Sequence, residues 1–117
     1  MATLLLKKSY QHKTLKEVSF NNLWNDHGVF TTMRVIGKPT KILFFKEHIN
    51  NLIKSLKIYK IDNKNLKKNI LNLIKLNINK NKKFDHLLRV AVNNKIISIS
   101  IRKRYRPKLN FTLKLIN

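Results

Sequence analysis

The arginine at position 34 lies inside a run of alternating residues, Val29 to Ile36, that is typical of a β-strand. A charge at this place is hard to explain by packing alone. A guanidinium is planar and carries five N–H donors, so it can recognise a carboxylate through two parallel hydrogen bonds. The other interpretation is an exposed arginine on the solvated face of a sheet. The sequence leaves both interpretations open.

The residues around this strand predict the elements that position it. The segment Gly37-Lys38-Pro39 breaks the alternation, which resumes from Thr40 to Phe45 and so predicts a β-hairpin. From Lys46 the apolar residues follow a helical period and share one face: Ile49, Leu52, Ile53 and Leu56. We therefore expect an amphipathic helix that packs on the hairpin.

The rest of the chain predicts further strands and one more helix. A short strand is expected at Thr3–Leu6, and Leu15–Phe20 is either a strand or a connection. A helix is expected over residues 63–78, with Asp62 as its N-cap. A second hairpin is expected from Leu87–Val92 and Ile96–Ile101, joined by a turn at Asn93-Asn94 with positive φ, and a last strand is expected over residues 109–115. The expected fold class is α+β, an antiparallel sheet of about five to seven strands packed against two helices in a single domain over residues 1–117.

Several of these segments together resemble a known family. The chain reads Gly28-Val29-Phe30-Thr31-Thr32-Met33-Arg34-Val35, then Gly37, and then Glu47 to Ser55 with His48, Asn51 and Leu52. This order resembles the small N-terminal domain of the class IV, or fold-type IV, pyridoxal-phosphate enzymes, with the later strands matched by Leu87–Val92 and Ile96–Ile101. That family includes branched-chain aminotransferases, D-amino-acid aminotransferases and aminodeoxychorismate lyases. The double threonine is most similar to the aminodeoxychorismate lyase branch.

The resemblance implies roles for particular residues. Arg34 and Arg89 would bind the substrate carboxylate, although Leu87 stands where the family's Tyr-x-Arg pattern has tyrosine. Phe30 would wall the substrate pocket, and a core aromatic is the alternative that its residue type favours. Asn51 takes the place of a helix arginine that holds the phosphate of pyridoxal phosphate, and a neutral amide there cannot form a bidentate clamp.

The resemblance also implies that this chain holds no catalytic residue. In the family the lysine that binds the cofactor covalently lies in a larger C-terminal domain, and this chain stops at Asn117. We therefore expect a truncated form, inactive alone, that pairs with a C-terminal domain or with a second copy of itself. Two aromatic residues, Tyr10 and Trp24, are expected in the core or at an interface, and His48 is expected to serve packing or hydrogen bonding.

The charge of the chain suggests an alternative function. The formal net charge is +21 and the pI is about 10.7, which is typical of proteins that bind polyanions. The alternative is thus a basic module that binds nucleic acid, although the abundance of Lys, Asn and Ile also fits codon bias. The chain has no cysteine, its four histidines lack ligand spacing, and no segment has the length of a membrane span, so we expect no metal and a cytoplasmic protein.

Overall fold

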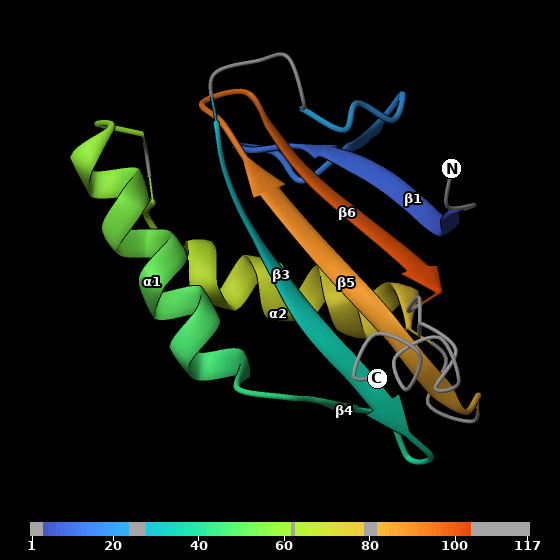
Figure 1. Cartoon of the computed structure of the whole chain (residues 1–117). Coiled ribbons are helices and arrows are strands. Elements are labelled where there is room, and N and C mark those ends of the chain that lie inside the picture. Colours follow the sequence, from blue (N-terminus) through green and yellow to red (C-terminus); the bar gives the residue numbers. More distant parts are fainter. Residues whose placement is uncertain (1–3, 24–27, 62, 79–81, 104–117) are drawn as a thin grey trace, which may run out of the picture.

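The computed structural model describes residues 4–23, 28–61, 63–78 and 82–103. Within these residues, six antiparallel strands form one sheet in the order β2-β1-β6-β5-β3-β4, and two helices lie against one of its faces (Figure 1). The strands are β1 (Leu4–Gln11), β2 (Glu17–Val18), β3 (Val29–Gly37), β4 (Lys41–Ile42), β5 (Phe84–Val92) and β6 (Ile96–Lys103). The helices are α1 (Phe45–Ile58) and α2 (Leu66–Asn77). The predicted α+β class, with its antiparallel sheet and two helices, is confirmed.

The hairpin of β5 and β6 forms the middle of the sheet. Alternate residues of both strands point toward the helices and are almost completely buried: Leu88, Val90, Val92, Ile97, Ile99 and Ile101. Strong alternation of β-branched residues favours this pleated, half-covered surface. The predicted second hairpin is confirmed, and the residues that face the helices are those that the alternation indicated.

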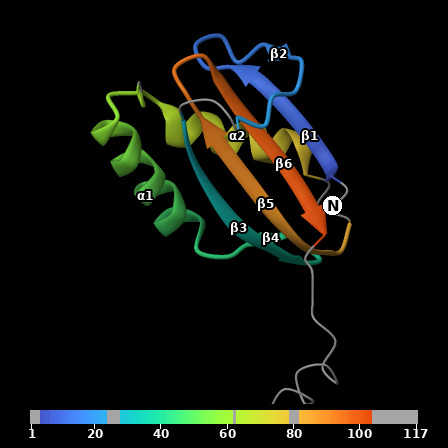
Figure 2. The same ribbon diagram turned by 45° about the horizontal axis from the view of Figure 1, so that its top comes forward.

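The first hairpin and α1 form the next part of the core. Met33 and Val35 of β3 are buried, and they belong to the same hydrophobic cluster as Ile49, Leu52 and Leu56 of α1. Figure 2 shows α1 and α2 on the same side of the sheet. The helix was predicted correctly, but the second strand of the hairpin is only Lys41–Ile42 long. Leu43 and Phe44 lead directly into the helix instead of continuing the strand.

The second helix begins later than predicted. Asn65, with φ 56, immediately precedes α2, and this left-handed conformation starts the helix at Leu66 rather than at residue 63. The predicted N-cap, Asp62, lies outside the described residues. The polar residue at the far end of the apolar stripe has a clear partner, because the Asn77 side-chain amide donates a hydrogen bond of 2.7 Å to the hydroxyl of Tyr10. Tyr10 is buried, as predicted.

Other predictions on the strands need correction. The first strand runs to Gln11, and the segment around Leu15–Phe20 forms only the two-residue strand β2. The turn at Asn93-Asn94 has no positive φ. Instead, the side-chain oxygen of Asn93 accepts hydrogen bonds from the backbone N–H groups of Lys95 and Ile96 at 2.8 and 2.7 Å, a side-chain-assisted turn that needs no left-handed residue. The predictions on Trp24 and on residues 109–115 lie outside the described part of the chain.

No helix in the described ranges is both long and apolar enough to cross a membrane.

Candidate functional site

The two predicted site arginines lie on the same face of the sheet. In the pairing of β3 with β5, Thr32 lies opposite Arg89 and Arg34 lies opposite Leu87. Paired residues of antiparallel strands share a face, and residues two apart along a strand do as well. The helices cover the other face, where Met33 and Leu88 are buried. We call the side that holds Arg34 and Arg89 the open face.

Arg89 is held by two different contacts on the open face. Its Cζ lies 4.8 Å from the centre of the Phe30 ring, a cation–π distance, and its Nη1 donates a hydrogen bond to the backbone carbonyl of Asn22. Burial lowers the pKa of the Arg89 guanidinium, although an arginine keeps its charge. Arg89 is therefore an oriented cation that has lost part of its hydration. Such a cation gains more from a bound anion than a fully hydrated one does.

Arg34 has an acidic neighbour on the same face. Its Nη2 lies 3.6 Å from Oδ1 of Asp85, and the two side chains are 39% and 43% exposed. Its Nε is buried and has no hydrogen-bond acceptor among the described residues. The two arginines thus differ, because Arg34 lies beside a carboxylate of the chain itself and Arg89 is oriented by an aromatic ring and a backbone carbonyl.

Phe30 lies on the open face and not in the core. Its side chain is 54% exposed, so the interpretation as a core aromatic is wrong. The physical reason is the parity of the strand: Phe30, Thr32 and Arg34 alternate with the residues that face α1. A large exposed aromatic ring beside an arginine is the arrangement that a substrate pocket would need.

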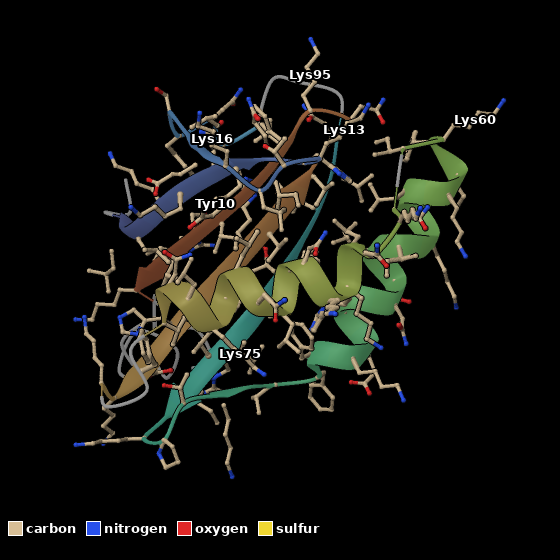
Figure 3. The ribbon with its side chains drawn as sticks, turned by 180° about the vertical axis from the view of Figure 1, so that it is seen from behind. Tyr10, Lys13, Lys16, Lys60, Lys75 and Lys95 are labelled. Atoms are coloured by element: carbon tan, nitrogen blue, oxygen red, sulfur yellow. The ribbon has the colours of Figure 1, made fainter. Side chains whose placement is uncertain are left out.

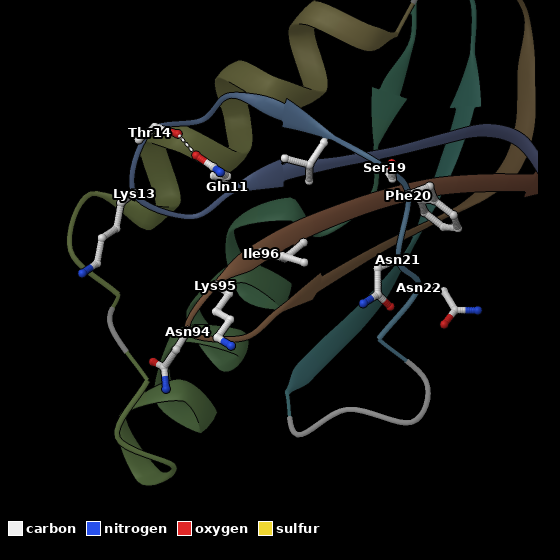
Figure 4. Close-up of a pocket in the computed structure, with 11 residues that line it drawn as sticks. Gln11, Lys13, Thr14, Ser19, Phe20, Asn21, Asn22, Asn94, Lys95 and Ile96 are labelled. Carbon is white, nitrogen blue, oxygen red and sulfur yellow. Dashed lines mark hydrogen bonds between the residues drawn. The ribbon is translucent and has the colours of Figure 1, made fainter.

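A segment that the sequence did not single out covers part of the open face. Residues 19–23 follow β2 and cross β6 (Figure 4), and we call them the strap. Ser9 and Ser98, both buried, hold the backbone of Asn21 through their hydroxyl groups. A sequence signal for this contact exists in the alternation of isoleucine with serine over Ile97–Ile101, where small residues leave room above the sheet.

A hollow of about 1080 Å³ lies at the end of the open face beside the strap. Figure 4 shows Asn21 and Asn22 of the strap on one side of it and Lys95 and Ile96 on another. None of the predicted site residues Arg34, Arg89 and Phe30 lines this hollow. The strap therefore lies between the hollow and Arg89, whose Nη1 donates a hydrogen bond to the Asn22 carbonyl.

The predicted cofactor residue, Asn51, does not share this site. It is exposed on α1, and α1 packs on the face of the sheet opposite to Arg34 and Arg89. The described residues therefore do not join Asn51 to the open face, and the assignment of Asn51 to a cofactor phosphate stays a prediction. His48 of the same helix forms a hydrogen bond of 3.1 Å between its Nδ1 and Oγ1 of Thr31, which confirms the expected structural role.

The positive charge is spread over several elements. Figure 3 labels Lys13 and Lys16 near the turn between β1 and β2, Lys60 after α1, Lys75 on α2, and Lys95 between β5 and β6. These lysine side chains project from different parts of the molecule. Within the described ranges, no group of three or more His, Cys, Asp or Glu residues is placed to hold a metal ion.

Comparison with known proteins identifies the family. The family model described as amino-transferase class IV matches residues 28–112, a region that includes both site arginines, Phe30, both helices and the central hairpin. Searches among curated proteins and among solved structures found no match. The match covers most of the chain and agrees with the fold. The chain therefore belongs to the class IV aminotransferase family.

Proposed function

We propose that this chain provides the substrate-binding wall of a class IV pyridoxal-phosphate aminotransferase or lyase that acts on amino-acid-like substrates. The observation that carries the proposal is the juxtaposition of Arg34, Arg89 and Phe30 on the open face, from two adjacent strands. A carboxylate is the anion that this arrangement suits best, because a guanidinium matches its planar, bidentate geometry.

The three residues would divide the task of holding a substrate. Arg89 would bind the carboxylate directly, since its orientation is already set by Phe30 and by the strap. Phe30 would contact the apolar part of the substrate next to that carboxylate. Arg34 would add positive potential nearby, reduced by Asp85. This preorganisation lowers the cost of ordering the side chains when the substrate binds.

The chemical step is assigned to other parts of the enzyme. Pyridoxal phosphate, on which the family in general depends, supplies an electron sink when it is bound. We propose that a second lobe, or a second copy of the chain, completes the cofactor site, and we assign no catalytic residue to the described residues. On this proposal the 117-residue chain retains no long-wavelength absorption band after incubation with the cofactor and dialysis. A band that survives dialysis would show that the chain itself anchors the cofactor.

Carboxylate binding tests the proposal directly. Sodium acetate is titrated into the 117-residue chain at constant ionic strength, with sodium chloride as the balancing salt, and the NMR signals of Arg89 are followed. The variant Arg89→Ala is expected to raise the Kd about tenfold or more, because a charged hydrogen-bond pair contributes about 1.5–3 kcal/mol.

Lys54→Ala serves as the matched control. Lys54 is exposed on α1, which packs on the face of the sheet opposite to Arg89. Its removal changes the net charge equally and should leave the acetate affinity nearly unchanged. Equal loss of affinity in both variants would mean that acetate responds only to net charge, and the proposed function would be wrong.

A further inference from the structure

Two buried serines hold the strap through a closed ring of hydrogen bonds. The backbone N–H of Asn21 donates to Oγ of Ser9 at 2.9 Å, the Oγ atoms of Ser9 and Ser98 are 2.7 Å apart, and Ser98 donates to the carbonyl of Asn21. Each hydroxyl has one proton, so the donation by Ser98 to the carbonyl leaves Ser9 as the donor between the two serines. The ring thus satisfies both backbone groups of Asn21.

The position of the serines explains how the strap comes so close to the sheet. Ser9, Ser98 and Ala91 lie opposite one another on β1, β6 and β5, and all three are at most 2% exposed. Their small side chains form a trough on the open face. The next residue in this row, across β3, is Phe30. The strap therefore lies over the small residues and ends next to the exposed ring.

The strap connects this ring of hydrogen bonds to Arg89. Asn22 follows Asn21 directly, and its carbonyl accepts the hydrogen bond from Nη1 of Arg89. That carbonyl shares a planar peptide unit with the N–H of Leu23, and this N–H donates a hydrogen bond of 2.9 Å to the side-chain oxygen of Asn21, which fixes the plane of the unit. The serines thus fix the backbone of Asn21, the Asn21 side chain then orients the Asn22 carbonyl, and this carbonyl together with the Phe30 ring fixes the plane of the guanidinium.

We propose that Ser9 and Ser98 are positioning residues that set the orientation of the Arg89 guanidinium for carboxylate binding through Asn21 and the carbonyl of Asn22. This inference rests on the proposed function in one respect, namely that Arg89 binds the carboxylate. The positioning itself is a property of the protein without ligand, so it can be measured separately.

The first experiment measures the guanidinium in the 117-residue chain without any ligand. Nitrogen-15 exchange NMR gives the rate of rotation of Arg89 about its Nε–Cζ bond, in wild type and in Ser98→Ala. We expect the rate to rise about three- to tenfold in the variant, as for the weakening of one neutral hydrogen bond. Ser55→Ala is the matched control, since Ser55 is half-buried on α1, which packs on the face of the sheet opposite to Arg89. Equal rates in Ser98→Ala and Ser55→Ala would overturn the proposal.

A milder variant covers the case in which Ser98→Ala fails to fold. Ser98→Cys keeps nearly the same volume and retains a weak donor, so it should give a rotation rate between those of wild type and alanine. A folded cysteine variant whose Arg89 rotates at the wild-type rate would likewise contradict the proposal.

The second experiment connects the positioning to binding. Acetate, titrated against chloride as above, should bind to Ser98→Ala about three- to tenfold more weakly than to wild type and Ser55→Ala. If wild type itself does not discriminate acetate from chloride, the proposed function fails while the rotation rates still decide the positioning. If acetate binds to wild type and to Ser98→Ala equally well, the serines do not position Arg89 for this ligand, and the inference fails while the proposed function stands.

Discussion

Replacing Asp85 by asparagine should have opposite effects on folding and on carboxylate binding. Asp85 lies 3.6 Å from Arg34, and both side chains are about two-fifths exposed. An ion pair with this exposure contributes about 0.2–1 kcal/mol to the free energy of unfolding. Asp85→Asn should therefore lower that free energy by less than about 1 kcal/mol, measured by urea unfolding.

The same change removes a negative charge from the neighbourhood of the proposed ligand. A carboxylate bound at Arg89 would lie about 13 Å from Asp85, four residues along β5, where two like charges repel each other by about 0.3 kcal/mol in water and more in a less polar environment. Because the site is partly exposed and screened by salt, we take about 0.3–0.7 kcal/mol as the relevant range. Acetate affinity should thus rise about two- to threefold in Asp85→Asn.

Glu17→Gln provides a control with the same change in net charge. Glu17 pairs with Lys8 at 3.0 Å near the far edge of the sheet, and the two side chains are 37% and 54% exposed, so the ion pair resembles that of Asp85. The Glu17→Gln substitution should lower the free energy of unfolding by a similar small amount and leave the acetate affinity almost unchanged. Our reasoning about Asp85 would be refuted if Asp85→Asn left acetate affinity at the wild-type value or lowered it, or if Glu17→Gln raised it equally.

Three further predictions concern the scaffold. Tyr10→Phe and Asn77→Leu should each lower the free energy of unfolding by about 0.5–3 kcal/mol in urea unfolding. The double variant should lower it by less than the sum of the two single changes, because removing both partners leaves no unsatisfied buried group. Burial, followed by the positive charge of neighbouring lysines, lowers the pKa of His86 below 6.5, so the unfolded chain binds more protons than the folded one at acidic pH. The contribution of His86 to the free energy of unfolding is therefore fully present above about pH 6.5 and is lost as the pH falls below it. His86→Gln should flatten this pH dependence in thermal unfolding followed between about pH 5 and 7. Leu88→Ala should lower the free energy of unfolding by about 2–5 kcal/mol, whereas Leu87→Ala, on the open face, should cost clearly less; equal losses would contradict the assignment of faces in β5.

The sequence predicted the elements well where a strong period was present. The alternation in β3, β5 and β6 and the helical period after Lys46 correspond to the observed strands and to α1. The family resemblance pointed to Arg34 and Arg89, and the register now places both on one face. Phe30 was assigned by residue type to the core, although it has the same parity as Arg34. Parity is the stronger argument here, because one strand face is covered and side chains alternate strictly.

Other parts of the site were beyond the reach of local patterns. The contacts of Ser98 with Ser9 and with Asn21 join residues 89 and 77 positions apart in the sequence. Such contacts depend on which strands become neighbours, and β1 and β6 come from opposite ends of the described chain. The side of the sheet on which Asn51 lies was not predicted for a related reason: a helical position can be read from the period, but the face of the sheet that the helix covers cannot. The short β4 and the late start of α2 depend on single backbone conformations at Phe44 and Asn65.

On the proposed function, the arrangement around Arg89 serves ligand binding rather than folding. A guanidinium that is partly desolvated, as the lowered pKa indicates, costs stability that a threonine or an alanine on the same strand would not cost. Its ring contact and its hydrogen bond to the strap offset part of that cost and fix its plane. A net charge of +21 attracts every anion over long distances, so it cannot by itself distinguish one anion from another. Discrimination must come from geometry, and a planar cation held in one orientation should prefer a planar carboxylate to a spherical chloride of equal charge. A chain that bound the two anions equally well at the same ionic strength would have a positively charged surface there but no carboxylate site.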